Sequence, residues 1–113
     1  MIKELLRRVK IGYATFKIQH VSRKALGQTD FGELEYGTNV IRIFGQQSNE
    51  ELVNTLMHEI GHGICYIFNI QFKTPREEED FIREYTNGII TVFRDNPKLL
   101  TFLKRNLKNL PNE

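Results

Sequence analysis

The chain contains a single cysteine, no tryptophan and no long run of apolar residues. Because Cys65 stands alone, no intrachain disulfide can form, and nothing in the composition indicates an oxidising compartment. No apolar stretch approaches the roughly 20 residues that a membrane-spanning helix needs. Residues 1–10 are interrupted by charges and lack the apolar core of a signal peptide. We therefore expect a cytoplasmic protein without a membrane partner.

An excess of charge of one sign is also lacking. Sixteen Lys and Arg against fourteen Asp and Glu give a net charge of only +2, which is too weak a bias to indicate nucleic-acid binding. Basic residues do gather near both ends of the chain, but such groups are usually solvated faces. These residues are Arg7, Arg8, Lys10, Lys98, Lys104, Arg105 and Lys108. Nucleic acid is therefore not expected as a partner, and the 113 residues are expected to form one domain, 1–113.

The first half of the chain has the periodicity of a small sheet. Apolar residues at helical spacing predict a short helical or mixed segment over residues 2–9. Alternating apolar residues predict a strand over residues 13–21, followed by a loop over residues 27–32. Two further strands, 33–36 and 40–44, flank Gly37-Thr38-Asn39 and are predicted to pair as a hairpin.

The second half is predicted to be helical. Ser48 and Glu51 form a capping box that opens a helix ending near Asn69. A second box, Thr74-Pro75-Arg76-Glu77, opens a helix to about Arg94, and a last short helix is expected over residues 98–107. A sheet followed by helices indicates the α+β class.

His58-Glu59-Ile60-Gly61-His62 matches H-E-x-x-H, in which two imidazoles lie one helical turn apart. The capping box independently predicts that this segment is helical, so both rings can grip one metal ion. Glu59 projects beside that ion, where it can accept a proton from a bound water as a general base. The motif therefore predicts a metal site in which His58 and His62 are ligands and Glu59 is catalytic.

Two details of the same helix favour this interpretation over an exposed face that carries these residues by chance. Gly61 and Gly63 lie in the helix interior, where each costs roughly 1 kcal/mol relative to alanine, so another element is expected to pack very close to them. The polar stripe that includes Thr55 and both histidines interrupts an otherwise apolar helix. Buried polar groups need partners, and a metal with its water would supply them.

A catalytic zinc ion usually has three protein ligands, so a third must be found. The extended metzincin pattern requires Gly at 65 and His at 68, and Cys65 and Phe68 exclude that class. The other common solution is a carboxylate from a following helix. Glu77 is expected to serve the capping box, whereas Glu79 lies on the stripe that should face the core. We predict Glu79 as the third ligand, with Glu78 in reserve.

Other residues near the motif have more ordinary explanations. Cys65 falls on the same helical face as the histidines, but a lone cysteine there is more often a small buried hydrophobe. His20 on a predicted strand is expected to be a surface or otherwise satisfied histidine. Tyr36, Tyr66 and Tyr85 can each supply a phenol that stabilises an oxyanion, and the sequence does not choose among them.

Several segments together resemble the small ImmA/IrrE-type zinc metallopeptidases of phages and mobile elements. They are Val40-Ile41-Arg42-Ile43, the stretch Asn54–His62, the Glu-rich helix start, Asn87-Gly88-Ile89 and Arg94-Asp95-Asn96-Pro97. Together with the short sheet before them, the resemblance covers roughly residues 11–100. In this family a Glu at the start of the next helix, with an apolar residue three positions later, is the third ligand. Glu79 and Ile82 match that spacing. Glu84-Tyr85-Thr86-Asn87 departs from the small-residue run that is more frequent in the family.

The resemblance implies a minimal zincin: a small, mostly antiparallel sheet packed on the H-E-x-x-H helix and a following ligand-bearing helix. It also implies one Zn²⁺ per chain and a peptide or protein substrate, with a transcriptional repressor as one candidate. We expect strand Val40–Phe44, if it forms the sheet edge, to hold that substrate by strand addition. The alternative is a metal-stabilised regulatory or protein-binding module that cleaves nothing, and a closed site with Cys65 as fourth ligand would favour it.

Overall fold

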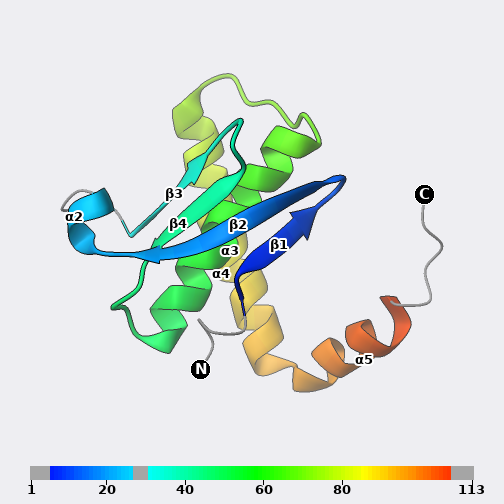
Figure 1. Cartoon of the computed structure of the whole chain (residues 1–113). Coiled ribbons are helices and arrows are strands. Elements are labelled where there is room, and N and C mark those ends of the chain that lie inside the picture. Colours follow the sequence, from blue (N-terminus) through cyan, green and yellow to red (C-terminus); the bar gives the residue numbers. More distant parts are fainter. Residues whose placement is uncertain (1–5, 27–30, 108–113) are drawn as a thin grey trace.

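The structure is a computed structural model that describes residues 6–26 and 31–107. Its four strands are β1 (Arg8–Ile11), β2 (Ala14–Val21), β3 (Gly32–Glu35) and β4 (Val40–Phe44). Its helices are α2 (Arg23–Leu26), α3 (Asn49–Ile67), α4 (Pro75–Asp95) and α5 (Pro97–Leu107). A sheet followed by helices confirms the predicted α+β class (Figure 1).

The strands lie in the order β1-β2-β4-β3. The pairs β1–β2 and β3–β4 are antiparallel, as predicted for a mostly antiparallel sheet, and the central pair β2–β4 is parallel. The condition under which Val40–Phe44 is expected to hold a substrate, a place at the sheet edge, is not met. Apolar side chains such as Ile18 and Ile41 are paired across β2 and β4 and bury each other, which places β4 in the interior. The edge beside it is β3.

The N-terminal prediction also needs correction. Residues 2–5 lie outside the described residues, but Arg8–Ile11 is a strand rather than a helix. Ile11 is buried and Val9 is partly buried, while Arg8 and Lys10 are exposed, which is the two-residue alternation of a strand. Of the predicted loop over residues 27–32, residues 27–30 are outside the described part of the chain and Gly32 already begins β3.

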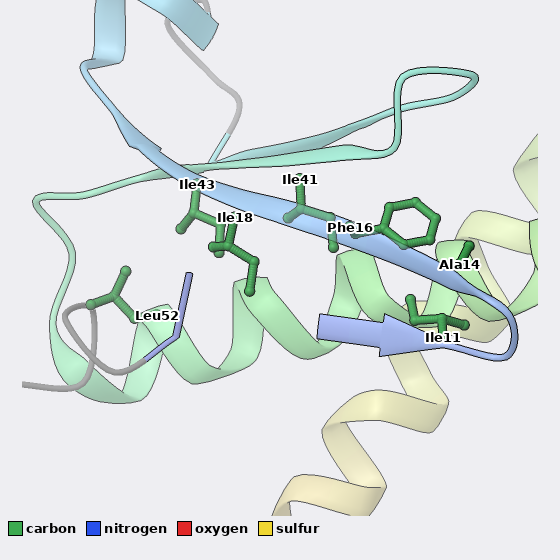
Figure 2. Packing of buried hydrophobic residues seen from close by; sticks show 7 residues of the cluster. All are labelled: Ile11, Ala14, Phe16, Ile18, Ile41, Ile43 and Leu52. Atoms are coloured by element: carbon green, nitrogen blue, oxygen red, sulfur yellow. The ribbon is translucent and has the colours of Figure 1, made fainter. Parts of the chain in front are cut away.

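The core lies between one face of the sheet and α3 (Figure 2). Phe16 from β2 and Ile41 and Ile43 from β4 are completely or almost completely buried. Fully burying a side chain of this size contributes roughly 1.5–3 kcal/mol. Leu52 from the first turns of α3 completes the contact from the helix side. This layer fixes the position of α3 relative to the sheet.

Both long helices begin where their caps predict. The Ser48 hydroxyl accepts from the Glu51 backbone, and the Glu51 carboxylate accepts from the Ser48 backbone, so the first capping box is complete. The second is half formed. The Thr74 hydroxyl accepts from the Glu77 backbone, but the Glu77 carboxylate accepts from the backbone N–H of Lys73 instead. Helices α3 and α4 end at Ile67 and Asp95, close to the predicted residues.

The layers run sheet, α3, α4, because α4 packs on α3 rather than on the sheet (Figure 1). Glycines allow both close contacts of α3, as predicted. A Cβ at Gly61 would lie 2.9 Å from Cγ2 of Ile82 on α4, and one at Gly63 would lie 2.8 Å from Cδ1 of Ile11 on β1. The H-E-x-x-H segment is therefore held between the sheet and α4.

Helix α5 extends away from the other elements and has no buried residue (Figure 1). The basic residues of both chain ends that the structure describes are exposed, in agreement with solvated faces. They are Arg7, Arg8, Lys10, Lys98, Lys104 and Arg105, and Lys108 lies outside the described residues. Among the described helices, none has the length and apolar character that crossing a bilayer would need.

Candidate metal centre

The two histidines of the motif lie one turn apart on α3, on the side that faces α4. Their rings meet edge to face with centroids 4.9 Å apart, and their Nε2 atoms are separated by 3.3 Å. Both side chains are mostly shielded from solvent, with exposed fractions of 18% for His58 and 15% for His62. Two imidazole nitrogens thus converge on one point at the boundary between α3 and α4.

Glu79 reaches the same point from the first turns of α4. One carboxylate oxygen lies 2.9 Å from Nε2 of His58, and the other lies 3.0 Å from Nε2 of His62. The three residues can each offer a ligand atom, and these atoms all lie within 4.8 Å of one another. Among the described residues this is the group that could hold a metal ion.

The geometry and the donor set of this group fit a zinc ion. Ligand atoms bound to a tetrahedral zinc ion at about 2.0–2.2 Å are roughly 3.3–3.6 Å apart. The two Nε2 atoms are 3.3 Å apart, at the lower limit of that range, and each lies 2.9 or 3.0 Å from a different oxygen of Glu79, somewhat nearer than bound ligands. Two imidazoles and one carboxylate are also a donor set that catalytic zinc sites use, with the fourth position left for water.

Glu78, the reserve ligand, lies on the other side of His62. The Nδ1–H group of His62 donates to the Glu78 carboxylate at 2.7 Å. A histidine that donates one ring N–H to a carboxylate keeps its other nitrogen free to bind a metal, with its ring held in a fixed orientation. Glu78 is therefore positioned to orient His62, while Glu79 lies beside both Nε2 atoms.

The carboxylates and imidazoles of the site shift one another's pKa values. Burial lowers the pKa of His62, but its hydrogen bond to Glu78 and the negative charge of Glu59 outweigh burial and raise that pKa. Burial raises the pKa of Glu79, but the charge of His58 and the hydrogen bonds from both imidazoles outweigh it, so this pKa is lowered. Glu79 thus remains a carboxylate, which is the form that binds metal.

Glu59 is buried, with an exposed fraction of 8%, and does not belong to the ligand group. It lies between α3 and the edge strand β3, where a Cβ at Gly32 would be 3.3 Å from its Oε2 atom and 2.6 Å from Cγ2 of Thr55. Glycine at position 32 lets the edge strand approach the carboxylate. Glu59 thus follows the ligand residue His58 on α3 and lies close to the start of the edge strand.

The other polar residues of the motif helix have partners in the protein itself. The Thr55 hydroxyl donates to the side-chain oxygen of Gln47 at 3.0 Å. Within the described residues, no buried side-chain nitrogen or oxygen lacks a hydrogen-bond partner. Cys65 is buried outside the ligand group, and burial together with the charge of Glu78 raises the pKa of its thiol. His20 is exposed on β2, as predicted.

The structure distinguishes the three tyrosines. Tyr85 is exposed on α4 and stacks on Phe81. Tyr36 follows the edge strand and packs edge to face on Tyr66, with ring centroids 4.8 Å apart. Of these three, only Tyr36 lines the groove next to the ligand group, and burial and the nearby charges of Glu78 and Glu59 raise the pKa of its phenol. Its hydroxyl therefore stays protonated and can donate a hydrogen bond.

An open groove of about 560 Å³ lies directly beside the ligand group. Tyr36 lines it from the β3–β4 turn, His62 from α3, and Glu78 and Glu79 from α4. The loop that connects α3 to α4, residues 70–74, contributes the remaining lining together with Pro75. Its volume is within the range of pockets that bind small molecules or side chains.

Neither a protein-family model, nor a curated protein, nor a solved structure matches this chain. The site is therefore interpreted from its own geometry. Three of its features could not be predicted from the motif: the contact of Glu78 with the far nitrogen of His62, the approach of Gly32 to Glu59, and the choice of Tyr36 among the tyrosines. The hairpin around Gly37-Thr38-Asn39 was the only sequence signal near Tyr36 and Gly32.

Proposed function

We propose that this protein is a zinc-dependent endopeptidase that hydrolyses a peptide bond of a peptide or protein substrate. The observation that carries the proposal is the convergence of His58, His62 and Glu79 beside a buried carboxylate, Glu59, that is not one of the ligands. A purely structural metal site has no need of such a carboxylate. A hydrolytic site needs it as a general base.

The roles of the residues follow from their positions. His58, His62 and Glu79 would hold the ion, and Glu78 would orient the His62 ring through its Nδ1–H group. A bound Zn²⁺ would supply a water of lowered pKa and polarise the substrate carbonyl. Glu59 accepts the proton of the attacking water and passes it to the leaving amine.

The edge strand β3 is the element that fits an extended substrate. It lies at the end of the sheet order and has β4 on its other side. Its Gly32 lies beside Glu59, so a chain added along its free edge passes the general base. Main-chain hydrogen bonds to β3 would then hold the scissile bond near the ligand group.

On the basis of the sequence resemblance alone, we include membership in the ImmA/IrrE-type zinc metallopeptidases in the proposal. The non-catalytic alternative, a metal-stabilised binding module, receives less support. Cys65 lies outside the ligand group and an open groove reaches that group, whereas a structural zinc site is normally closed by four protein ligands.

Substitution of the general base tests the proposal. Glu59→Gln keeps the shape of the side chain and removes no ligand, so the variant should retain zinc by elemental analysis and lose cleavage of a denatured protein substrate. Removing a general base typically lowers the rate by about 10²–10⁴-fold. Glu84→Gln, an exposed residue on α4, is the matched control and should cleave like the wild type. Unchanged cleavage by Glu59→Gln would contradict the mechanism.

A further inference from the structure

Large apolar side chains that remain exposed gather around the groove at the metal centre. Those on its two borders come from the β3–β4 turn, the end of α3, the following loop and α4. They are Tyr36, Tyr66, Ile70, Phe81 and Tyr85. Scattered exposed apolar residues need no explanation, but a group of them beside a site marks a binding surface.

One border is a row of three aromatic rings. Phe72 lines the groove and packs against Phe81 with ring centroids 5.6 Å apart. Phe81 in turn stacks on Tyr85 at 5.4 Å, with the two rings nearly parallel. The groove lining contains polar residues, among them Gln71 and Lys73, beside its apolar part. Phe81 and Tyr85 are 48% and 56% exposed, so the row continues that apolar part onto the surface of α4.

The second border comes from the pair Tyr36 and Tyr66. Tyr66 holds the Tyr36 ring edge to face, and Tyr36 lines the groove beside His62. Because Tyr36 follows the last residue of the edge strand β3, a chain added along β3 runs into this part of the groove. Ile70 and Pro75 add aliphatic surface to the lining.

We propose that this groove is the specificity site of the metal centre and that it takes a bulky apolar side chain, aromatic or branched aliphatic, of the polypeptide substrate. The inference rests on the proposed function, because the occupant is the substrate of that centre. His62 and Glu79 of the ligand group and Phe72 of the aromatic row line the same groove, so the surface that recognises the side chain is continuous with the site of hydrolysis.

A matched set of peptides tests the inference separately from catalysis. The peptides consist of alanine and serine with Phe, Leu, Ser or Asp at one central position. Their binding to zinc-loaded Glu59→Gln protein is measured by fluorescence anisotropy, and their cleavage by the zinc-loaded wild type is measured in parallel. We expect the Phe and Leu peptides to bind at least about tenfold more tightly than the Ser peptide, which is the discrimination that one apolar pocket supplies.

Variants locate that preference in the groove. Phe72→Ala and Phe81→Ala, each combined with Glu59→Gln, should reduce the ratio of Phe-peptide to Ser-peptide affinity by about tenfold and about threefold respectively. Phe102→Ala, which removes an aromatic side chain that is 60% exposed on α5, should leave the ratio unchanged. A ratio is used because partial loss of folded protein affects both peptides equally.

Each outcome decides one proposal. The specificity site would be overturned if the Phe and Ser peptides bind equally or if no peptide binds. It would also be overturned if Phe102→Ala lowers the affinity ratio as much as Phe72→Ala does. Concentration-dependent association of the chain that Phe81→Ala abolishes would assign the aromatic row to a second copy and would also overturn it. A preference for apolar peptides without cleavage by the wild type would contradict hydrolysis and leave the specificity site standing.

Discussion

The two faces of α3 are held by different kinds of contact. Towards the sheet, the face packs on apolar side chains such as Phe16, Ile41 and Ile43, which water does not reach. Towards α4, Ile82 packs against Gly61, and several polar pairs also join the two helices. The polar pairs include the amides of Asn54 and Asn87, which lie 2.5 Å apart, and the contacts of the two histidines with Glu78 and Glu79.

This difference indicates a division of labour, in which one layer stabilises the fold and the other forms the metal centre. A fold layer built from apolar burial is stable without any ligand, whereas a layer built around imidazoles and carboxylates depends on what those groups bind. The sheet and α3 therefore form the scaffold. Helix α4, which brings Glu79 to the histidines, is expected to be held in place partly by the metal.

The largest effect on stability is expected on the scaffold side. Phe16→Ala removes a completely buried ring between the sheet and α3 and should lower the free energy of unfolding by about 3–5 kcal/mol. Urea denaturation should give the same loss with zinc and with chelator. Phe102→Ala on the exposed surface of α5 should stay within about 0.5 kcal/mol of the wild type. A loss for Phe16→Ala that appears only without zinc would contradict the division of labour.

Removal of the metal should weaken the contact between α3 and α4. At a free zinc concentration about 100 times the Kd, zinc should add about 2.7 kcal/mol to the free energy of unfolding. Hydrogen exchange should show that chelation reduces amide protection mainly in α4, Pro75–Asp95, and little in β2 and β4. Uniform loss of protection over helix and sheet would mean that the two faces of α3 are not independent.

Two glycines form a matched pair for the contact between α3 and α4. Gly61→Ala places a Cβ 2.9 Å from Ile82 and should destabilise the protein by about 1–3 kcal/mol. Gly88→Ala on α4 meets no atom within 4 Å and should stabilise by up to about 1 kcal/mol, as expected at an open helix position. Thermal unfolding measures both. Destabilisation by Gly88→Ala would show that another element packs on α4 at that position.

Removal of the carboxylate that orients His62 should weaken zinc binding less than removal of a ligand. Glu78→Gln keeps all three ligands and should weaken zinc affinity by about 10–100-fold, measured by competition with a chromophoric chelator. Glu79→Gln removes a ligand and should weaken it more. The reverse order of the two variants would exchange the roles of Glu78 and Glu79.

The smallest effect is expected from the exposed ion pairs of α4. The hydrogen bond from Arg83 and the charge of Arg76 outweigh partial desolvation and lower the pKa of Asp80 below the usual value of about 3.9. A lowered pKa in the folded state means that the carboxylate adds stability above pH 4 and that this addition disappears as the pH falls through the folded pKa. The small stability difference between wild type and Asp80→Asn should therefore vanish in acid denaturation curves, and an increase towards low pH would contradict it.

The local signals in the sequence were sufficient for the long helices α3 and α4 and for the candidate site that they present, but not for the short helix α2. Ser48 and Thr74 are N-caps whose side chains bond to the backbone three residues later, so the helix starts could be predicted from short-range chemistry. The motif histidines then follow from helical spacing alone. Glu79 could be chosen because its face of α4 is set by its distance from Ile82 along the same helix.

Features that depend on contacts distant in sequence could not be predicted. The parallel pairing of Ile18 with Ile41 joins segments that no local pattern connects, and it places β4 in the interior of the sheet. Residues near Val9 are too few for a reliable periodicity, so residues 2–9 are predicted as a helical or mixed segment, whereas Arg8–Ile11 forms a strand. The bond between His62 and Glu78 requires the relative position of two helices, which capping and spacing do not fix.

X-ray absorption at the zinc edge tests the centre most directly. For the purified, zinc-loaded protein we predict one zinc ion per chain that is bound by nitrogen and oxygen atoms at about 2.0–2.2 Å, with the signature of two imidazoles that is lost in His58→Ala and His62→Ala. A sulfur neighbour at about 2.3 Å would bring Cys65 into the site and contradict an open catalytic centre. Protein that takes up no zinc at all would contradict the centre itself.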